Sequence, residues 1–126
     1  MLDYRSILDK AAGEAKDFVN NPSRMDALLE QLEEKLRQIP AIGETASGLP
    51  VMIAMIKSWI KKEYEVQPKV LAILAGAILY VVKGRDLIPD SIPVVGIADD
   101  VAVIGLALKL CEKELNEYRA WKANKL

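Results

Sequence analysis

The sequence predicts an all-α protein: a small irregular bundle of four to five helices, with an Asp/Pro-rich turn between the two central helices. Three observations support this fold class. Apolar residues recur at alternating spacings of three and four, which is the period of an amphipathic helix. The 126 residues are 52% hydrophobic and 28% charged, as in a globular domain with a filled core. The length suits one domain that needs no disulfide or metal to fold.

The first forty residues predict a helical hairpin. One apolar stripe predicts a helix over roughly residues 2–20, and a second stripe predicts a helix over roughly 23–39. Such short helices are expected to pair inside one molecule; the alternative is the seam of a dimer. Residues 40–50 contain two prolines and two glycines and are expected to be the longest loop. This loop is the expected boundary after the 1–40 hairpin.

Residues 50–123 predict a second helical unit. A helix with a broad apolar face is expected over about 50–65. Pro68 opens the next helix, whose run 70–82 is apolar throughout, so this helix is expected to be buried on most sides. Thirteen residues are too few to span a bilayer, which requires about 20. The last helix is expected from residue 97 or 99 to 123.

The absence of histidine and the single cysteine exclude many kinds of chemistry. Without histidine there is no Ser-His or Cys-His pair, no imidazole acid or base and no H-E-x-x-H zinc site. One cysteine forms no internal disulfide and no multi-cysteine zinc site. Cys111 falls in the apolar seam of the last helix, which predicts a buried small hydrophobe; the alternative is a reactive thiol. No catalytic or cofactor-binding residue is identified.

The charge balance argues against nucleic acid as a partner. Seventeen basic and eighteen acidic residues give a net charge of −1. The first residues carry charge where a secretory signal would be apolar, so a cytoplasmic location is expected. The helix over 50–65 places Trp59 beside Lys57, Lys61 and Lys62. Such a helix either faces the core or lies on an anionic membrane surface.

Four aspartates interrupt the apolar sequence between the last two predicted helices: Asp86, Asp90, Asp99 and Asp100. A carboxylate near a core needs a partner. The first two can accept backbone N–H groups in turns shaped by Pro89 and Pro93, and the last two can cap the final helix. The alternative is a site for a hard cation such as Mg²⁺, Mn²⁺ or Ca²⁺, because no softer ligand is present. The spacing does not fit an EF-hand loop.

The same segment, over roughly residues 68–105, resembles the YkvA-like family, a bacterial helical domain of unknown function. The resemblance consists of Ala77-Ile78-Leu79-Tyr80 at a helix end, a D-L-I-P-D-x-I-P turn, and G-x-x-D-D at a helix start. The matching motif positions are Tyr80, Asp86, Pro89, Asp90, Pro93, Gly96, Asp99 and Asp100. One departure is Lys83-Gly84-Arg85, where the family often has Ser-Pro and an apolar residue. The resemblance implies a small helical fold, membrane association in some relatives, and no established reaction.

Together these features favour a non-enzymatic helical interaction or scaffold module, acting through a protein partner or self-association, with a membrane surface as a further site of contact. No cofactor is expected. The alternative is a cation-binding domain, or a cation-dependent enzyme, in which the four aspartates hold Mg²⁺ or Ca²⁺.

Overall fold

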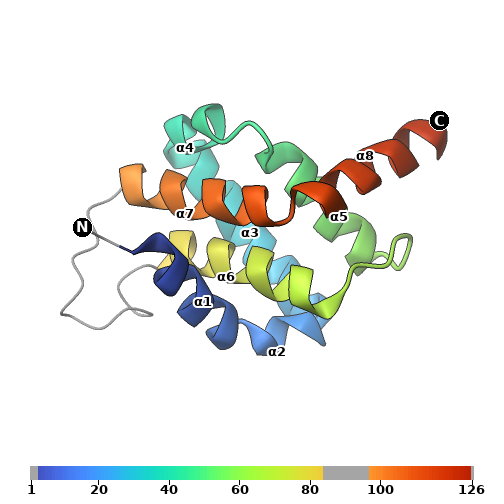
Figure 1. Ribbon diagram of the computed structural model, residues 1–126, viewed down its shortest axis with the longest axis horizontal. Helices are drawn as coiled ribbons and strands as arrows, with labels where there is room; N and C mark the ends of the chain where they lie inside the picture. The colour runs from blue at the N-terminus through green and yellow to red at the C-terminus, as the bar shows by residue number, and fades with distance from the viewer. Residues whose placement is uncertain (1–2, 84–96, 126) are drawn as a thin grey trace.

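The computed structural model describes residues 3–83 and 97–125. Within these ranges the chain is all-α, with eight helices and no strand (Figure 1). The helices are α1 (Tyr4–Glu14), α2 (Lys16–Val19), α3 (Pro22–Gln38), α4 (Pro40–Thr45), α5 (Leu49–Ile60), α6 (Pro68–Lys83), α7 (Ile97–Leu110) and α8 (Glu112–Lys125). The all-α class is confirmed, but the predicted count of four to five helices differs from the eight that the described residues form.

The higher count has local causes. The first predicted helix is divided at Ala15, whose amide bonds to the carbonyls three and four residues earlier, while Phe18 N–H bonds back to Ala15 over only three residues. The expected loop 40–50 contains α4, which starts at Pro40, a favoured first residue of a helix. The last predicted helix is divided at Cys111, although hydrogen bonds continue on both sides of this residue. The division into units 1–40 and 50–123 stays a prediction.

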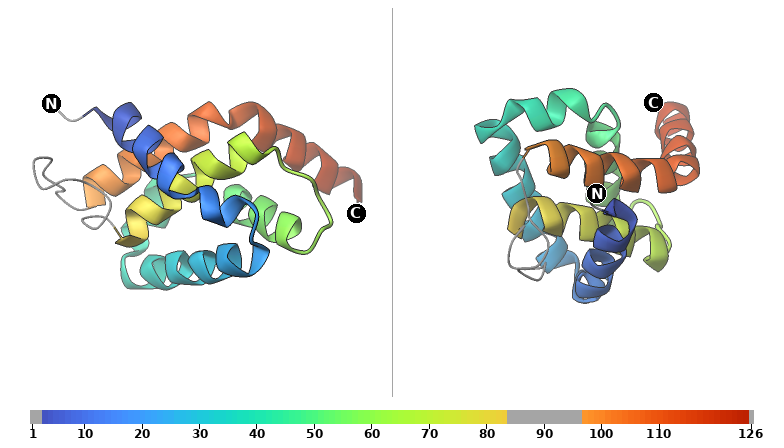
Figure 2. Two further views of the ribbon diagram at one scale, coloured as in Figure 1. Left: turned by 90° about the horizontal axis from the view of Figure 1, so that it is seen from below. Right: turned by 60° about the vertical axis from the view of Figure 1, so that its left-hand side comes forward.

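Helix α6 is the centre of the bundle. Ten of its sixteen residues are buried, as the apolar run 70–82 predicted. Helices α1, α2, α3 and α7 all pack against it, and the two views of Figure 2 show α6 enclosed between α1 and α7. The apolar stripes of α1 and α3 therefore both pack against α6, a helix that lies outside the predicted hairpin.

The contact between α1 and α6 depends on Gly76. A Cβ atom at this position would lie 2.6 Å from the backbone N of Ala12 and 2.9 Å from the carbonyl carbon of Ala11. Real Cβ atoms do not approach backbone atoms this closely. The two helices therefore touch backbone to backbone at this crossing, and only glycine fits at position 76 without moving one of them.

Helix α5 ends earlier than the predicted residue 65 because it closes in a Schellman motif. The amide of Lys62 donates to the carbonyl of Trp59 at 3.0 Å, and the amide of Glu63 donates to the carbonyl of Ser58 at 2.9 Å. This geometry requires a left-handed residue, and Lys62 has φ 63°. Glycine is the usual residue there, because a Cβ atom makes the left-handed conformation unfavourable.

We expect Gly76→Ala to lower the free energy of unfolding by about 3 kcal/mol, because the added methyl group must push the α1 backbone away from α6. Gly105→Ala is the matched control: it lies inside α7, and nothing is within 4 Å of its added Cβ. This variant should gain about 0.5 to 1 kcal/mol from its higher helix propensity. Urea denaturation measures both, and equal effects would show that the crossing is not tight.

Lys62→Gly should raise the free energy of unfolding by about 1 kcal/mol, because it relieves the left-handed strain at the end of α5. Thermal and urea denaturation measure this gain. Lys61→Gly, one residue earlier at φ −80°, is the control and should give no gain. A loss of stability on Lys62→Gly would mean that the lysine side chain contributes more than the strain costs.

Candidate functional site

The two described aspartates of the motif lie at one corner of the bundle, where α1, α3, α6 and α7 meet. Asp99 and Asp100 stand in the first turn of α7, where the helix dipole favours negative charge. Both are buried, with 4% and 5% of their surface exposed. Buried carboxylates require partners, and the partners come from distant parts of the chain.

Asp99 joins α7 to the start of α1. The hydroxyl of Tyr4 donates to Oδ1 of Asp99 at 2.5 Å, across 95 positions of sequence. This hydrogen bond raises the pKa of Tyr4 above its ordinary value, because donating to the carboxylate stabilises the protonated phenol. The first turn of α1 is thereby fixed to the first turn of α7.

Asp100 joins α7 to α3 through Lys35. Nζ of Lys35 lies 3.6 Å from Oδ2 of Asp100 and also donates to the carbonyl of Val81 in the last turn of α6. Burial raises the pKa of Asp100, and the Lys35 ammonium opposes this rise. One ammonium group thus bridges the C-terminal end of α6 and the N-terminal end of α7, which carry opposite dipole charge.

Tyr80 completes the corner. Its side chain is 1% exposed, and its hydroxyl has no hydrogen-bond partner among the described residues. Burial, then the nearby negative charges of Asp99 and Asp100, raise its pKa to about 12. Tyr80 therefore keeps its proton to a more alkaline pH than an ordinary tyrosine, and among the described residues its hydroxyl has no acceptor.

Of the predicted motif residues, the structure brings together Tyr80, Asp99 and Asp100. The others lie outside the described residues: Asp86, Pro89, Asp90, Pro93 and Gly96. Across residues 3–83 and 97–125, no three acidic or cysteine side chains are grouped so as to hold a metal ion. The four-aspartate cation site, with its Mg²⁺ or Ca²⁺, stays a prediction.

Sequence reasoning missed two residues of this corner. Tyr4 falls in the apolar stripe of the first predicted helix, and Lys35 falls among the polar residues of the second. The spacing of apolar residues predicted that Tyr4 faces the core, but nothing in the sequence identified Asp99 as its partner. The half-buried Lys35 carries no local signal, because its two partners lie on helices far along the chain.

The opposite end of the molecule carries an aromatic cluster, here called the aromatic end and made of Trp59, Tyr64, Tyr118 and Trp121. The Tyr64 ring centroid lies 5.0 Å from that of Tyr118 and 4.9 Å from that of Trp121. Tyr118 holds α8 against α5: its hydroxyl lies 2.7 Å from Oγ of Ser58 and donates to the carbonyl of Ala54 at 3.1 Å. Trp121 joins the cluster through Tyr64, and Trp59 lines the same groove as Tyr64, so both tryptophans of the chain lie at this end.

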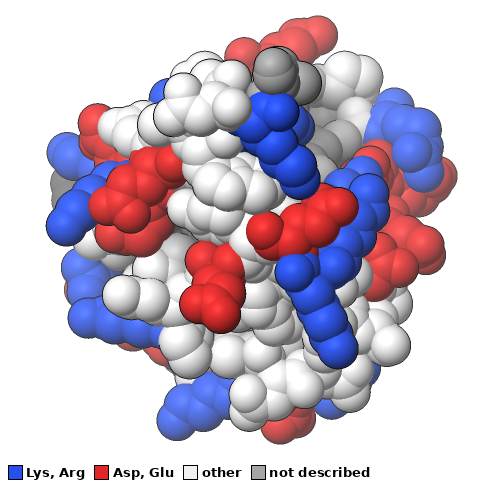
Figure 3. All heavy atoms as spheres, turned by 90° about the vertical axis from the view of Figure 1, so that its right-hand side faces the viewer, with Lys and Arg blue, Asp and Glu red and all other residues white. Residues whose placement is uncertain are grey.

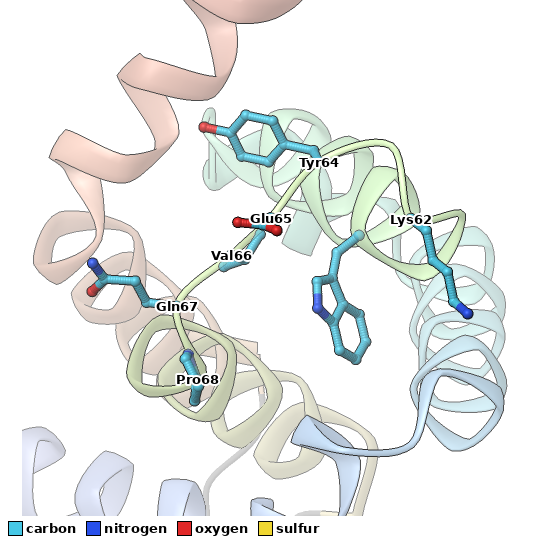
Figure 4. A pocket seen from close by; sticks show the side chains of 7 residues that line it. Lys62, Tyr64, Glu65, Val66, Gln67 and Pro68 are labelled. Atoms are coloured by element: carbon cyan, nitrogen blue, oxygen red, sulfur yellow. The ribbon is translucent and has the colours of Figure 1, made fainter.

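An open groove of about 670 Å³ lies beside this cluster (Figure 4). It is lined by Trp59 and by the segment that connects α5 to α6: Lys62, Tyr64, Glu65, Val66, Gln67 and Pro68. Of the three lysines that the sequence placed beside Trp59, Lys57 is paired with Glu33 at 3.2 Å. Lys61 and Lys62 remain exposed at the end of the helix.

Cys111 is buried, and burial raises the pKa of its thiol to about 11. The prediction of a small buried hydrophobe is confirmed, because a reactive cysteine needs a lowered pKa and access to solvent. None of the helices in the described ranges combines the length and the hydropathy needed to cross a membrane.

Residues 70–106 match a family described as "Protein of unknown function (DUF1232)". Over 69 residues the chain is 44% identical to a protein of Bacillus subtilis (strain 168) that bears the name "Uncharacterized membrane protein YkvA". The alignment covers 54% of this chain and 65% of that relative. No solved structure shows significant similarity to the chain.

Tyr80→Phe and Tyr118→Phe should differ in their effect at pH 7. The first removes a hydroxyl without a partner among the described residues, so we expect little change in the free energy of unfolding. The second removes a hydroxyl that contacts Ser58 and Ala54, so we expect a loss of about 1 to 2 kcal/mol. An equal loss in Tyr80→Phe would reveal a partner of Tyr80 outside the described residues.

The pH dependence gives a second measurement on Tyr80. A pKa of about 12 in the folded state, against 10.0 ordinarily, means that the fold binds this proton more tightly than the unfolded chain. Its contribution to stability is present below pH 10 and is lost between pH 10 and about 12. Tyr80→Phe should therefore lose less stability over this range than the wild-type protein, as measured by urea denaturation at each pH.

Proposed function

We propose that this chain is a non-enzymatic helical interaction module that works at a membrane surface. The resemblance to the YkvA-like family is confirmed. The described part of the family motif serves to hold the bundle together. The observation that carries the proposal is the set of contacts at the Asp99–Asp100 corner.

Both carboxylates at this corner contact side chains of other helices. Asp99 accepts the Tyr4 hydroxyl, and Asp100 lies beside the ammonium of Lys35. A general acid or base must reach the proton that it transfers, whereas these two residues expose at most 5% of their surface. Their contacts connect four helices and support an architectural role for the motif.

The membrane part of the proposal is supported by the name of the Bacillus subtilis relative, of which this chain matches 65%. A second support is the aromatic end. Tryptophan and tyrosine are enriched at the level of lipid headgroups, because their rings are apolar and their edges are polar. Partner proteins or other copies of the chain are then recruited at that surface.

Vesicle flotation tests the membrane role. The folded protein should float with vesicles of phosphatidylcholine that contain phosphatidylserine, and less with phosphatidylcholine alone. Bovine serum albumin serves as a protein that should stay in the lower fraction with both. Absence from the floating fraction with both lipids, while circular dichroism shows a folded protein, would contradict the membrane role.

A thermal-shift titration separates this proposal from a cation-dependent function. We expect no rise in melting temperature with Mg²⁺, Mn²⁺ or Ca²⁺, since a cation that bound only the folded state would raise it. Asp99→Asn should lower the melting temperature, because a neutral amide replaces the charged acceptor of the Tyr4 hydrogen bond. A cation-dependent rise that Asp99→Asn abolishes, with higher stability of that variant in chelator, would overturn the non-enzymatic assignment.

A further inference from the structure

We propose that the aromatic end, together with the lysines around it, is the surface that docks on anionic phospholipid headgroups. This inference rests on the membrane role proposed above, and it adds the place on the molecule and the chemistry of the lipid. Figure 3 views this end directly and shows uncharged surface between basic and acidic side chains.

The first support is the position of the aromatic side chains. Both tryptophans of the chain, Trp59 and Trp121, lie here, and together with Tyr64 they are only partly buried. Trp59 comes from the end of α5 and Trp121 from the end of α8, 62 positions later in the sequence. The fold thus assembles, at one end of the molecule, the residue types that prefer a membrane interface.

The second support is local charge. The two segments that form this end, 61–69 and 117–125, contain six lysines and arginines against three glutamates, although the whole chain has a net charge of −1. All five lysines of these segments are exposed, and none joins an ion pair in the described structure. Nζ of Lys125 lies 4.8 Å from the centroid of the Trp121 ring. Exposed ammonium groups beside aromatic rings suit a surface of lipid phosphates.

The third support is Lys62. This lysine lines the 670 Å³ groove beside Trp59 and Tyr64, and it occupies a left-handed position that glycine would fill without strain. Non-glycine residues in this conformation cluster at functional sites. Here the lysine adds a positive charge to the rim of the groove. Because Glu65 also lines the groove, the excess of positive charge that suits an anionic headgroup comes from the exposed lysines around the groove as well as from Lys62.

The test uses the intrinsic fluorescence of Trp59 and Trp121, because both report on this end alone. Vesicles of phosphatidylcholine and phosphatidylserine carry brominated acyl chains, which quench tryptophan on contact. Lys122→Gln with Lys125→Gln should weaken vesicle binding about thirty-fold, since each lysine near an anionic surface contributes a factor of about five. The matched control, Lys10→Gln with Lys16→Gln, removes the same charge from exposed positions on α1 and α2 and should change binding less than three-fold.

Lys62→Gly adds a variant that we expect to be more stable than the wild-type protein, so that weaker binding would not reflect unfolding. It should weaken vesicle binding about five-fold while its melting temperature rises, so that binding and stability change in opposite directions. Unchanged binding of this variant would overturn the assigned role of the groove.

The outcomes separate the two proposals. Quenching with a selective loss in the Lys122/Lys125 variant supports the aromatic end. Flotation without quenching, or equal weakening by both double variants, overturns this surface and leaves the membrane role intact. No flotation of the wild-type protein on either lipid overturns both, and would point to a protein partner for the same end.

Discussion

The backbone contact at Gly76 sets the geometry on which the other contacts depend. Because α1 approaches α6 without an intervening side chain, its first turn comes within reach of α7, and Tyr4 can bond to Asp99. A wider crossing would move Tyr4 away and leave a carboxylate buried without this donor. Apolar packing and the polar corner are therefore coupled, since the close packing of small residues brings the charged groups to their partners.

At the Asp99–Asp100 corner, the charged side chains are opposite in sign to the partial charges of the helix ends beside them. The C-terminal end of α6 carries partial negative charge on its carbonyls, and Lys35 binds there through Val81. The N-terminal end of α7 carries partial positive charge, and Asp99 and Asp100 stand in its first turn. Each helix end thus has a side chain of opposite charge beside it among the described residues.

Local regularities were predictable from the sequence. The apolar period located α3, α5 and α6, and the uninterrupted run of α6 predicted its central place. The divisions at Ala15 and Cys111 were not predictable, because the apolar stripe continues through both residues.

The candidate sites were less accessible to sequence reasoning. Asp99 was predicted at a helix start, but Tyr4 and Lys35 pair with the motif over 95 and 65 positions, and no local pattern encodes such contacts. The aromatic end was only half predicted: Trp59 stood out beside its lysines, whereas Trp121 joins it through the path that α8 takes. Asp86 and Asp90 lie outside the described residues, so the role expected for them rests on the motif alone.

Because Cys111 is buried, its reaction with an alkylating reagent can measure how often this part of the protein opens. The thiol lies at the junction of α7 and α8, and α8 buries two side chains, Leu115 and Tyr118, while Trp121 packs against them partly buried. A thiol with a pKa of about 11 reacts slowly while it is enclosed. Its rate of alkylation therefore reports how often the junction of α7 and α8 opens, whether by local opening or by global unfolding. The single cysteine offers this readout without any engineered label.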